Sequence, residues 1–348
     1  MEVSTALKRA TIRMLGTKPI GRIAAPFYRG RGVIFTLHRV LERPESTLIP
    51  GIAITQRFLE DLVRYTRKRG FEFLALEEAA NSLLVGHRRS PFACLTFDDG
   101  YADILTNALP ILEAYRIPFT VFLVSGFLNR TVVGSWNLLE EFILQVPRIC
   151  LPHPGLENGF SSRSLEEKRA AFRMLNLLQW RDKRLTATIE EMAADRGIDP
   201  RKVLDARYLT DVQVRRLLSS GLCELGGHTY SHPPLSHLTR EAARRELVDS
   251  RATLSATFGV EINLVAYPFG SSGQCGSREF SLASECGYRV GVTTRPGNVF
   301  AEHRDKLLAL PRTGLSLFPH AHNLWFVEAS LTGARNAFMN RLRRVRRE

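Results

Sequence analysis

The sequence predicts an α/β protein built on parallel strands, either a barrel or a doubly wound sheet. Short runs of β-branched and aromatic residues alternate with amphipathic helical stretches along most of the 348 residues. The composition, with 44% hydrophobic and 24% charged residues, is typical of a folded protein with a sizeable core. No apolar run is long enough to predict a transmembrane helix. The N-terminus lacks an apolar signal core, and the five scattered cysteines lack CxxC spacing, so we expect reduced thiols and a cytoplasmic location.

The predicted elements alternate in order from a first strand at residues 32–38. They continue at 54–69 (helix), 71–74 (strand), 76–84 (helix), 92–97 (strand), 103–115 (helix) and 119–124 (strand). Residues 127–205 interrupt the alternation with three helices, an insertion that either shapes a substrate cleft or only stabilises the fold. The alternation resumes at 210–219 (helix), 223–225 (strand), 239–258 (helix), 264–267 (strand), 278–286 (helix) and 288–293 (strand). The body of the fold is therefore predicted over residues 32–318.

The buried strand at residues 92–97 ends in two adjacent carboxylates, Asp98 and Asp99, followed by Gly100. In α/β folds the carboxyl end of a strand is where catalytic groups lie. Two neighbouring carboxylates repel each other, which raises the pKa of one, and a cation can hold the other ionised. The alternative is an Asx turn in which one aspartate only caps the following helix.

Two histidines, His228 and His232, lie four residues apart after another short strand. On one helical turn both imidazoles would reach the same ion. Together with Asp99 they would provide three protein ligands and leave a position open for water, the pattern of a catalytic metal site. The sequence therefore predicts an Asp-His-His metal centre at the carboxyl ends of the strands.

Three motifs resemble those of the polysaccharide deacetylases of the NodB-homology class, carbohydrate esterase family 4. Residues 96–100 (TFDDG), 228–233 (HTYSHP) and 267–270 (YPFG) are similar to the first three motifs of that family in order and spacing. The resemblance covers residues 32 to about 314. It implies a distorted (β/α) barrel of about seven parallel strands. It also implies hydrolysis of the acetamide of N-acetylated sugars in a polysaccharide, an oligosaccharide or a lipid-linked glycan.

The resemblance also implies residue roles. Asp98 would be the general base, and Asp99, His228 and His232 would hold a divalent metal, with zinc favoured over cobalt, nickel or manganese. The residues expected to line the substrate cleft are Tyr101, Tyr267, Pro268, Phe269 and Gly270. Trp136 is expected to be a packing residue.

Two departures from the family pattern bear on the chemistry. The family usually has an arginine two residues before the proline of the third motif, where it braces the catalytic aspartate; this chain has Ala266. The usual Leu-x-His motif that supplies the general acid is absent after Leu310, where only His320 and His322 follow. The first predicted strand, however, ends in Thr36-Leu37-His38, as in exopolysaccharide-cluster deacetylases that look circularly permuted. We therefore predict His38 as the acid, with a buried strand-end histidine as the alternative.

The net charge of +13 is concentrated at the two ends of the chain. Residues 1–34 carry a balance of +6 and residues 335–348 a balance of +5, which leaves +2 for the rest. Each end also has a short apolar stripe, which predicts peripheral contact with an anionic membrane, on its inner face if the protein is cytoplasmic. We interpret residues 1–31 as a basic, partly irregular segment and 319–348 as a basic helical tail. The alternative is a pair of solvated, partly disordered ends.

The leading functional hypothesis is a metal-dependent deacetylase, and two alternatives compete with it. Ala266 and the missing C-terminal Leu-x-His favour a catalytically impaired, carbohydrate-binding pseudoenzyme of the same fold, whereas the intact ligand set disfavours it. A nucleic-acid binder acting through the basic ends is the other alternative, although the nearly neutral body argues against a nucleic-acid groove. We expect no nucleic-acid partner.

Overall fold

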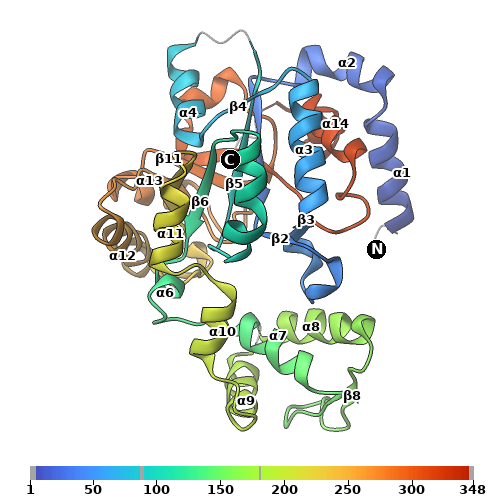
Figure 1. Ribbon diagram of the computed structural model, residues 1–348, viewed down its shortest axis with the longest axis vertical. Helices are drawn as coiled ribbons and strands as arrows, with labels where there is room; N and C mark the ends of the chain where they lie inside the picture. Colours follow the sequence, from blue (N-terminus) through green and yellow to red (C-terminus); the bar gives the residue numbers. More distant parts are fainter. Residues whose placement is uncertain (1–4, 87–89, 180–181, 345–348) are drawn as a thin grey trace.

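A closed barrel of seven parallel strands forms the centre of the computed structural model, which describes residues 5–86, 90–179 and 182–344 (Figure 1). The strands are β1 (Gly32–Leu37), β5 (Phe92–Phe97), β6 (Phe119–Leu123), β9 (Cys223–Gly227), β10 (Leu264–Ala266), β11 (Val290–Pro296) and β12 (Leu310–Gly314). The first strand closes the barrel, because β1 pairs with β12 on one side and with β5 on the other. A two-residue strand, β4 (Glu72–Phe73), extends the sheet beside β5. The predicted parallel barrel is confirmed.

The barrel is distorted around β10, the strand that leads into the third motif at residues 267–270. Strands β9 and β10 share one registered pair, Gly227 opposite Val265, and the register shifts between β11 and β12. On the other side of β9, a Cβ atom at Gly226 would lie 2.4 Å from the ring of Phe122 on β6, so glycine is required where β9 pairs with β6. Every residue of β1, β5 and β6 is buried, as expected for parallel strands covered by helices.

Helices cover the outer face of the barrel between successive strands. They are α3 (Gln56–Lys68), α4 (Leu76–Val85), α5 (Leu109–Ala114), α6 (Ser125–Leu128), α11 (Asp211–Leu218), α12 (Arg240–Phe258) and α13 (Ser277–Glu285). A small parallel pair, β2 (Arg39–Leu41) with β3 (Ala53–Thr55), follows β1. Local signals fix several helix starts: at α11 the Thr210 hydroxyl accepts a hydrogen bond from Gln213 N, while the Gln213 side chain accepts one from Thr210 N.

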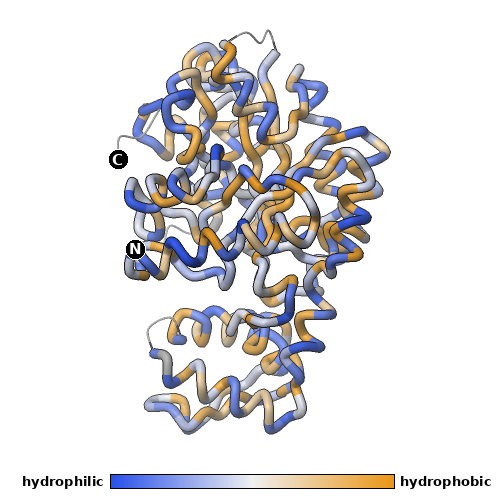
Figure 2. Tube along the Cα trace, turned by 90° about the vertical axis from the view of Figure 1, so that its left-hand side faces the viewer, coloured by the Kyte–Doolittle hydropathy of each residue, from blue (hydrophilic) through white to orange (hydrophobic). Residues whose placement is uncertain are grey.

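The predicted insertion between β6 and β9 forms a separate helical lobe below the barrel (Figures 1 and 2). Its elements are α7 (Ser135–Gln145), β7 (Arg148–Ile149), β8 (Phe160–Ser161), α8 (Leu165–Gln179), α9 (Lys183–Ala194) and α10 (Pro200–Arg207). The lobe has its own apolar core, which includes Leu139, Phe142, Leu175 and Ile189. Leu48, from the connection between β2 and β3, joins this core, so the lobe is seated on the barrel.

The two ends of the chain pack against each other and against the barrel. Helix α1 (Thr5–Leu15) contacts α14 (Leu324–Leu331), and α2 (Lys18–Tyr28) contacts α15 (Ala334–Met339). The interpretation of residues 319–348 as a tail is wrong for α14, because Phe326, Val327 and Leu331 belong to the main barrel core. Each predicted apolar stripe has one residue outside the described part of the chain. These residues are Val3 at the N-terminal end and Val345 at the C-terminal end.

Residues 18–28 form the helix α2, which corrects the expectation that part of the segment 1–31 is irregular. Glycine and proline dominate the local pattern there, but Gly21 lies on the buried side of α2, where a Cβ atom would meet Thr332 at 3.0 Å. Packing against α14 and α15 therefore overrides the weak helix propensity of the segment. Within the described part of the chain, no helix has the length and apolar character needed to cross a bilayer.

Candidate metal centre

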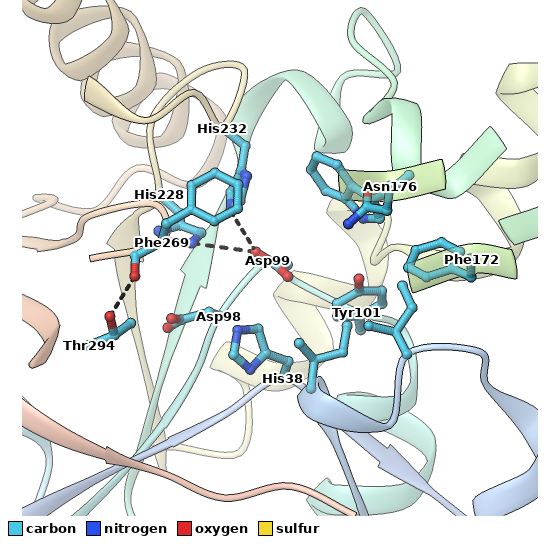
Figure 3. Close-up of a pocket in the computed structure, with 13 residues that line it drawn as sticks. His38, Asp98, Asp99, Tyr101, Phe172, Asn176, His228, His232, Phe269 and Thr294 are labelled. Carbon is cyan, nitrogen blue, oxygen red and sulfur yellow. Dashed lines mark hydrogen bonds and ion pairs between the residues drawn. The ribbon is translucent and has the colours of Figure 1, made fainter. Parts of the chain in front are cut away.

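The carboxyl ends of three barrel strands bring the predicted polar residues together. His38 follows β1, Asp98 and Asp99 follow β5, and His228 follows β9. Because parallel strands end on the same side of a barrel, these side chains surround one hollow of about 280 Å³ (Figure 3). The residues that line it are His38, Ile49, Ile52, Asp98, Asp99, Tyr101, Trp136, Phe172, Asn176, His228, His232, Phe269 and Thr294.

Three side chains form a buried Asp-His-His cluster in this hollow. Asp99 Oδ1 lies 3.4 Å from His228 Nε2 and 3.3 Å from His232 Nε2, and all three residues are buried. Two ligand atoms at about 2.0–2.1 Å from a tetrahedral zinc ion are roughly 3.3 Å apart, so this spacing fits a shared cation. Asp99 Oδ1 is also a buried oxygen without a hydrogen-bond donor among the described residues. The donor set therefore fits a divalent metal ion.

The electrostatics of the cluster favour an ionised Asp99 and a neutral His232, the forms in which these side chains bind a metal ion. Burial would raise the pKa of Asp99, but the two facing histidines outweigh it and hold the pKa well below its usual range. Burial lowers the pKa of His232, whereas the carboxylates of Asp99 and Asp98 outweigh burial at His228 and raise its pKa. His228 Nδ1 lies 2.6 Å from the carbonyl oxygen of Ala266, which orients Nε2 toward Asp99.

The two histidines are not on a helix, which corrects the expected helical turn. His228 immediately follows β9, and the chain bends over residues 229–232, with φ of 63° at Thr229 and 64° at His232. Glu246 on α12 holds the turn, because its carboxylate accepts hydrogen bonds from Tyr230 N at 2.9 Å and Ser231 N at 2.8 Å. The sequence analysis missed Glu246, since nothing local connects it to a turn fifteen residues earlier.

Asp98 is paired with Arg312 from β12, a residue that the sequence analysis also missed. Arg312 donates two hydrogen bonds to the Asp98 carboxylate, both at 2.7 Å, and both side chains are buried. It also donates to Thr96 Oγ1 and Thr293 O, which fixes its orientation. Burial opposes ionisation of Asp98, but Arg312 holds its pKa below the usual range.

Arg312 thus pairs with Asp98, as the arginine that the family usually has at the position of Ala266 was expected to do. The signal for it was weak but present: an arginine in an otherwise apolar strand, Leu310-Pro311-Arg312, has to find a buried anion. The partner itself is 214 residues away in the sequence, so no local pattern identifies it.

Only one of the three histidines considered for the acid role lines the hollow among the described residues. His38 lies near Asp98 and Asp99 in Figure 3, and its Nδ1 is buried without a hydrogen-bond partner. His322 instead lies 3.1 Å from the Thr55 hydroxyl and packs on the ring of Phe58. His320 stacks on Phe318, whose side chain is exposed.

Only two of the five residues expected to line the substrate cleft lie in the lining of the hollow. Tyr101 and Phe269 line the hollow, with the Phe269 side chain 37% exposed. Tyr267 is corrected: it is fully buried, packs on Phe280 and donates its hydroxyl to Leu308 O. Pro268 and Gly270 are also absent from the lining, because they form the turn that presents Phe269, in which Gly270 N donates to Pro268 O.

The lobe supplies a second wall of the hollow, one of the two roles that the sequence left open for the insertion. Trp136 from α7 and Phe172 and Asn176 from α8 line the hollow. Figure 3 shows Phe172 and Asn176 across the hollow from Asp98 and His228. Trp136 was expected to be a packing residue, but its ring centre lies 5.2 Å from that of His232. The insertion therefore contributes to the pocket as well as to stability.

The fold and the cluster define a class of protein, a parallel α/β barrel with a candidate divalent-metal centre at the carboxyl ends of its strands. A model of the polysaccharide deacetylase family matches residues 86–149 and 164–291, more than half of the chain. The chain belongs to the polysaccharide deacetylase family.

Individual relatives are distant. YxkH of Bacillus subtilis, named as a polysaccharide deacetylase, is 21% identical over 270 residues, which cover 76% of this chain and 67% of YxkH. The poly-β-1,6-N-acetyl-D-glucosamine N-deacetylase of Staphylococcus aureus is 23% identical over 129 residues, 37% of this chain and 44% of that enzyme. This second match therefore spans less than half of the curated enzyme.

Solved structures share the fold. The deacetylase PplD of Streptococcus pyogenes, in complex with acetate, has a TM-score of 0.55 at 20% identity, covering 82% of this chain and 92% of PplD. IcaB from Ammonifex degensii has a TM-score of 0.53 at 18% identity, covering 86% of this chain and 98% of IcaB. At these identities the likeness establishes the architecture alone.

Proposed function

We propose that this protein is a metal-dependent N-deacetylase that hydrolyses the acetamide of N-acetylated sugars in a glycan. The observation that carries the proposal is the arrangement around the hollow. The Asp99-His228-His232 cluster lies beside Asp98, which Arg312 keeps ionised, and His38 lies across the same hollow. This arrangement offers ligands, a base and an acid for cleaving an unactivated amide.

The cluster would hold the divalent cation, with zinc favoured and cobalt, nickel or manganese as alternatives. A cation bound there supplies a Lewis acid that polarises an acyl carbonyl and makes a water molecule acidic enough to lose a proton near neutral pH. Asp99, His228 and His232 are oriented for this by their neighbours, in particular the Ala266 carbonyl and the turn held by Glu246.

The remaining residues account for the proton transfers. Asp98 accepts a proton from water as the oxygen attacks the acyl carbon, and Arg312 fixes the carboxylate in place. His38, in its protonated form, gives a proton to the sugar nitrogen as the C–N bond breaks. The immediate products are acetic acid and a free amine on the sugar. Acetic acid ionises to acetate and its proton goes to the amine, while Asp98 releases its proton to solvent and His38 takes one back, so atoms and charges balance.

The walls of the hollow support a sugar substrate. Tyr101, Trp136, Phe172 and Phe269 provide aromatic surface around the polar groups, and Asn176 provides an amide. Aromatic rings pack on the apolar faces of sugars, and amides bond to hydroxyls. The printed name of the Staphylococcus aureus relative, an N-deacetylase of poly-β-1,6-N-acetyl-D-glucosamine, suggests that polymer as the first substrate to try.

Purified protein tests the proposal. It should release acetate from N-acetylglucosamine oligomers, lose activity on chelation and recover it when zinc is restored. Glycan binding that does not depend on metal, with no turnover of any oligomer, would instead support the carbohydrate-binding pseudoenzyme. Arg312 and His38 weaken that alternative, because they fill the two positions whose apparent loss had favoured it. The cytoplasmic location stays a prediction, which fractionation of cells expressing the full chain would test.

A further inference from the structure

We infer that helix α2 and the adjoining C-terminal turn form a docking surface for an anionic phospholipid membrane, at the end of the barrel opposite the metal centre. The inference does not depend on the proposed function. It rests on exposed apolar side chains on α2, on a hollow lined by arginines beside them, and on the position of both relative to β1.

Helix α2 is apolar on both of its sides. Its inner side packs Ile20 and Ala24 near Leu15 and Ala329. On its outer side Ile23 is 73% exposed and Phe27 is 57% exposed. These two residues are four positions apart, so they project from one face of the helix. A helix whose only role is to cover a core carries polar residues on its outer face, whereas an interfacial helix buries apolar residues in the lipid headgroup region.

Positive charge surrounds these apolar residues. The chain has no aspartate or glutamate from Val3 to Leu41, and the exposed cations on α2 and directly after it are Lys18, Arg22, Arg29 and Arg31. Cations beside an apolar helical face are attracted to anionic lipid headgroups. The charge and the apolar face therefore favour the same partner.

A hollow next to Phe27 joins the two ends of the chain. Arg29 and Arg31 line it together with Arg344 from the C-terminal turn, and among the described residues Glu302 is the one carboxylate in its lining. Arginine binds phosphate through a planar fork of donors, so three arginines around one hollow suit a lipid phosphate. The hollow lies directly beside Phe27, so a lipid bound there has its acyl chains near the apolar face of α2.

Two other occupants are less consistent with these residues. A second copy of the chain would bring two clusters of like charge together, which opposes self-association through this face. Nucleic acid would use the arginines but leaves no role for an exposed isoleucine, because it is bound through phosphates, base edges and stacking. An anionic membrane uses both features of the surface.

The docking surface and the metal centre are at opposite ends of β1. Arg31, in the hollow, immediately precedes the strand, and His38, in the catalytic hollow, immediately follows it. Six residues of strand span roughly 20 Å. Figure 1 shows the same arrangement, with α2 at the top and the lobe at the bottom. A protein docked through α2 therefore presents its metal centre away from the bilayer, toward glycan segments that project from the membrane.

Flotation of the full-length protein with vesicles tests the inference. At low salt, the wild type should float with vesicles that contain phosphatidylglycerol and much less with pure phosphatidylcholine. Combined Ile23→Ser and Phe27→Ser should lower the bound fraction at least about tenfold, because the apolar insertion is lost. Arg29→Gln with Arg31→Gln should remove the preference for anionic vesicles. Val212→Ser is the matched control, since Val212 is 72% exposed on α11, on the flank of the barrel, and should leave flotation unchanged.

Several results would overturn the inference. One is that the wild type and the Ile23→Ser, Phe27→Ser variant float equally well. Another is that the wild type does not bind vesicles, while both proteins bind a nucleic-acid duplex in a salt-sensitive way. A dimer in solution that dissociates in the same variant, without vesicle binding, would assign the face to a second copy. Thermal melting and acetate release from a soluble oligomer should be the same in all variants, which shows that any loss concerns docking alone.

Discussion

The barrel and the helical lobe face each other across one hollow, but they contribute different kinds of side chain to it. The barrel supplies every ionisable group among the described lining residues that the proposed chemistry needs. Arg312 holds Asp98, and the Ala266 carbonyl orients His228. The lobe supplies two aromatic rings and one amide. Its own core is almost entirely apolar. We therefore propose that the strand ends determine the reaction and that the insertion determines how the substrate fits.

The two regions are nevertheless coupled at one seam. Tyr101, after β5, stacks on Tyr208, after α10, and the Tyr208 hydroxyl is hydrogen-bonded to Asn137 of α7. Glu140, also on α7, accepts a hydrogen bond from Leu48 N and forms an ion pair with Arg207. Because these groups are buried and paired, the lobe is held at a fixed distance from the metal centre. Substitutions that separate chemistry from fit should therefore be placed away from this seam.

Asp99→Ala tests the barrel's side of the comparison with the largest expected effect. The change removes the ligand that both histidines face, so bound metal and acetate release should both fall to background. Metal analysis after dialysis and an acetate assay measure this. A variant that still holds one zinc ion per chain would contradict the ligand assignment. Asp98→Asn is the matched control, since it should keep the metal and lose activity.

Arg312→Met should destabilise the protein by about 3–5 kcal/mol, because it leaves the Asp98 carboxylate buried without its partner. Denaturant unfolding measures the loss, and activity should fall as well. Adding Ala266→Arg to this variant moves the arginine to the position usual in the family and should restore part of both. If Arg312→Met unfolds at the wild-type denaturant concentration, the ion pair does not have the role assigned to it.

His38→Ala should lower turnover by about 10²-fold while leaving metal content unchanged, the typical effect of a missing general acid. The control is His322→Ala, whose imidazole contacts Thr55 and Phe58 rather than the hollow, and which should retain turnover. Full activity of His38→Ala combined with an inactive His322→Ala would reverse the assignment and would also remove the argument for a circular permutation.

Acid should weaken the barrel through His303, which lies just before β12. Burial lowers the pKa of His303 to about 4, and its Nδ1 accepts a hydrogen bond from Phe300 N. In the unfolded chain the pKa of His303 is near 6.5, so between pH 6.5 and 4 the unfolded state binds a proton that the folded state does not bind. The free energy of unfolding therefore falls as the pH falls from about 6.5 to 4. At pH 5 the loss is about 2 kcal/mol. Denaturant unfolding of the wild type and of His303→Asn measures this. The free energy of unfolding of the wild type should fall more steeply between pH 6.5 and 4, and the same pH dependence in both proteins would contradict the role of His303.

Asn176→Ala tests the lobe's side with the smallest effect. Loss of one hydrogen bond to a sugar should raise KM by roughly threefold to tenfold and leave kcat nearly unchanged. Steady-state kinetics on oligomers measure both constants, and Leu177→Ala, an exposed position on the same helix, is the control. A fall in kcat with unchanged KM would mean that Asn176 acts in the chemical step, which would contradict the assignment of the reaction to the barrel and of substrate fit to the lobe.

The sequence by itself determined the parallel barrel and the identity of the candidate ligands. Strands and helices are encoded by local periodicity, and a carboxylate or imidazole at the end of a buried strand must face the same end of the barrel as its neighbours. Asp98, Asp99, His228 and His38 were therefore found from patterns within a few residues of each. The family motifs reinforced these assignments without supplying the geometry.

Tertiary structure alone decided which distant groups complete that site. Arg312 meets Asp98 across 214 residues of sequence, Glu246 holds the histidine turn from another helix, and Asn176 reaches the hollow from the lobe. The same holds for α2, whose helix forms against α14 and α15 in spite of its glycine and prolines. The physical reason is that a buried charge or a weak helix is stabilised by whichever partner the chain topology brings near, and that partner leaves no mark on the local sequence.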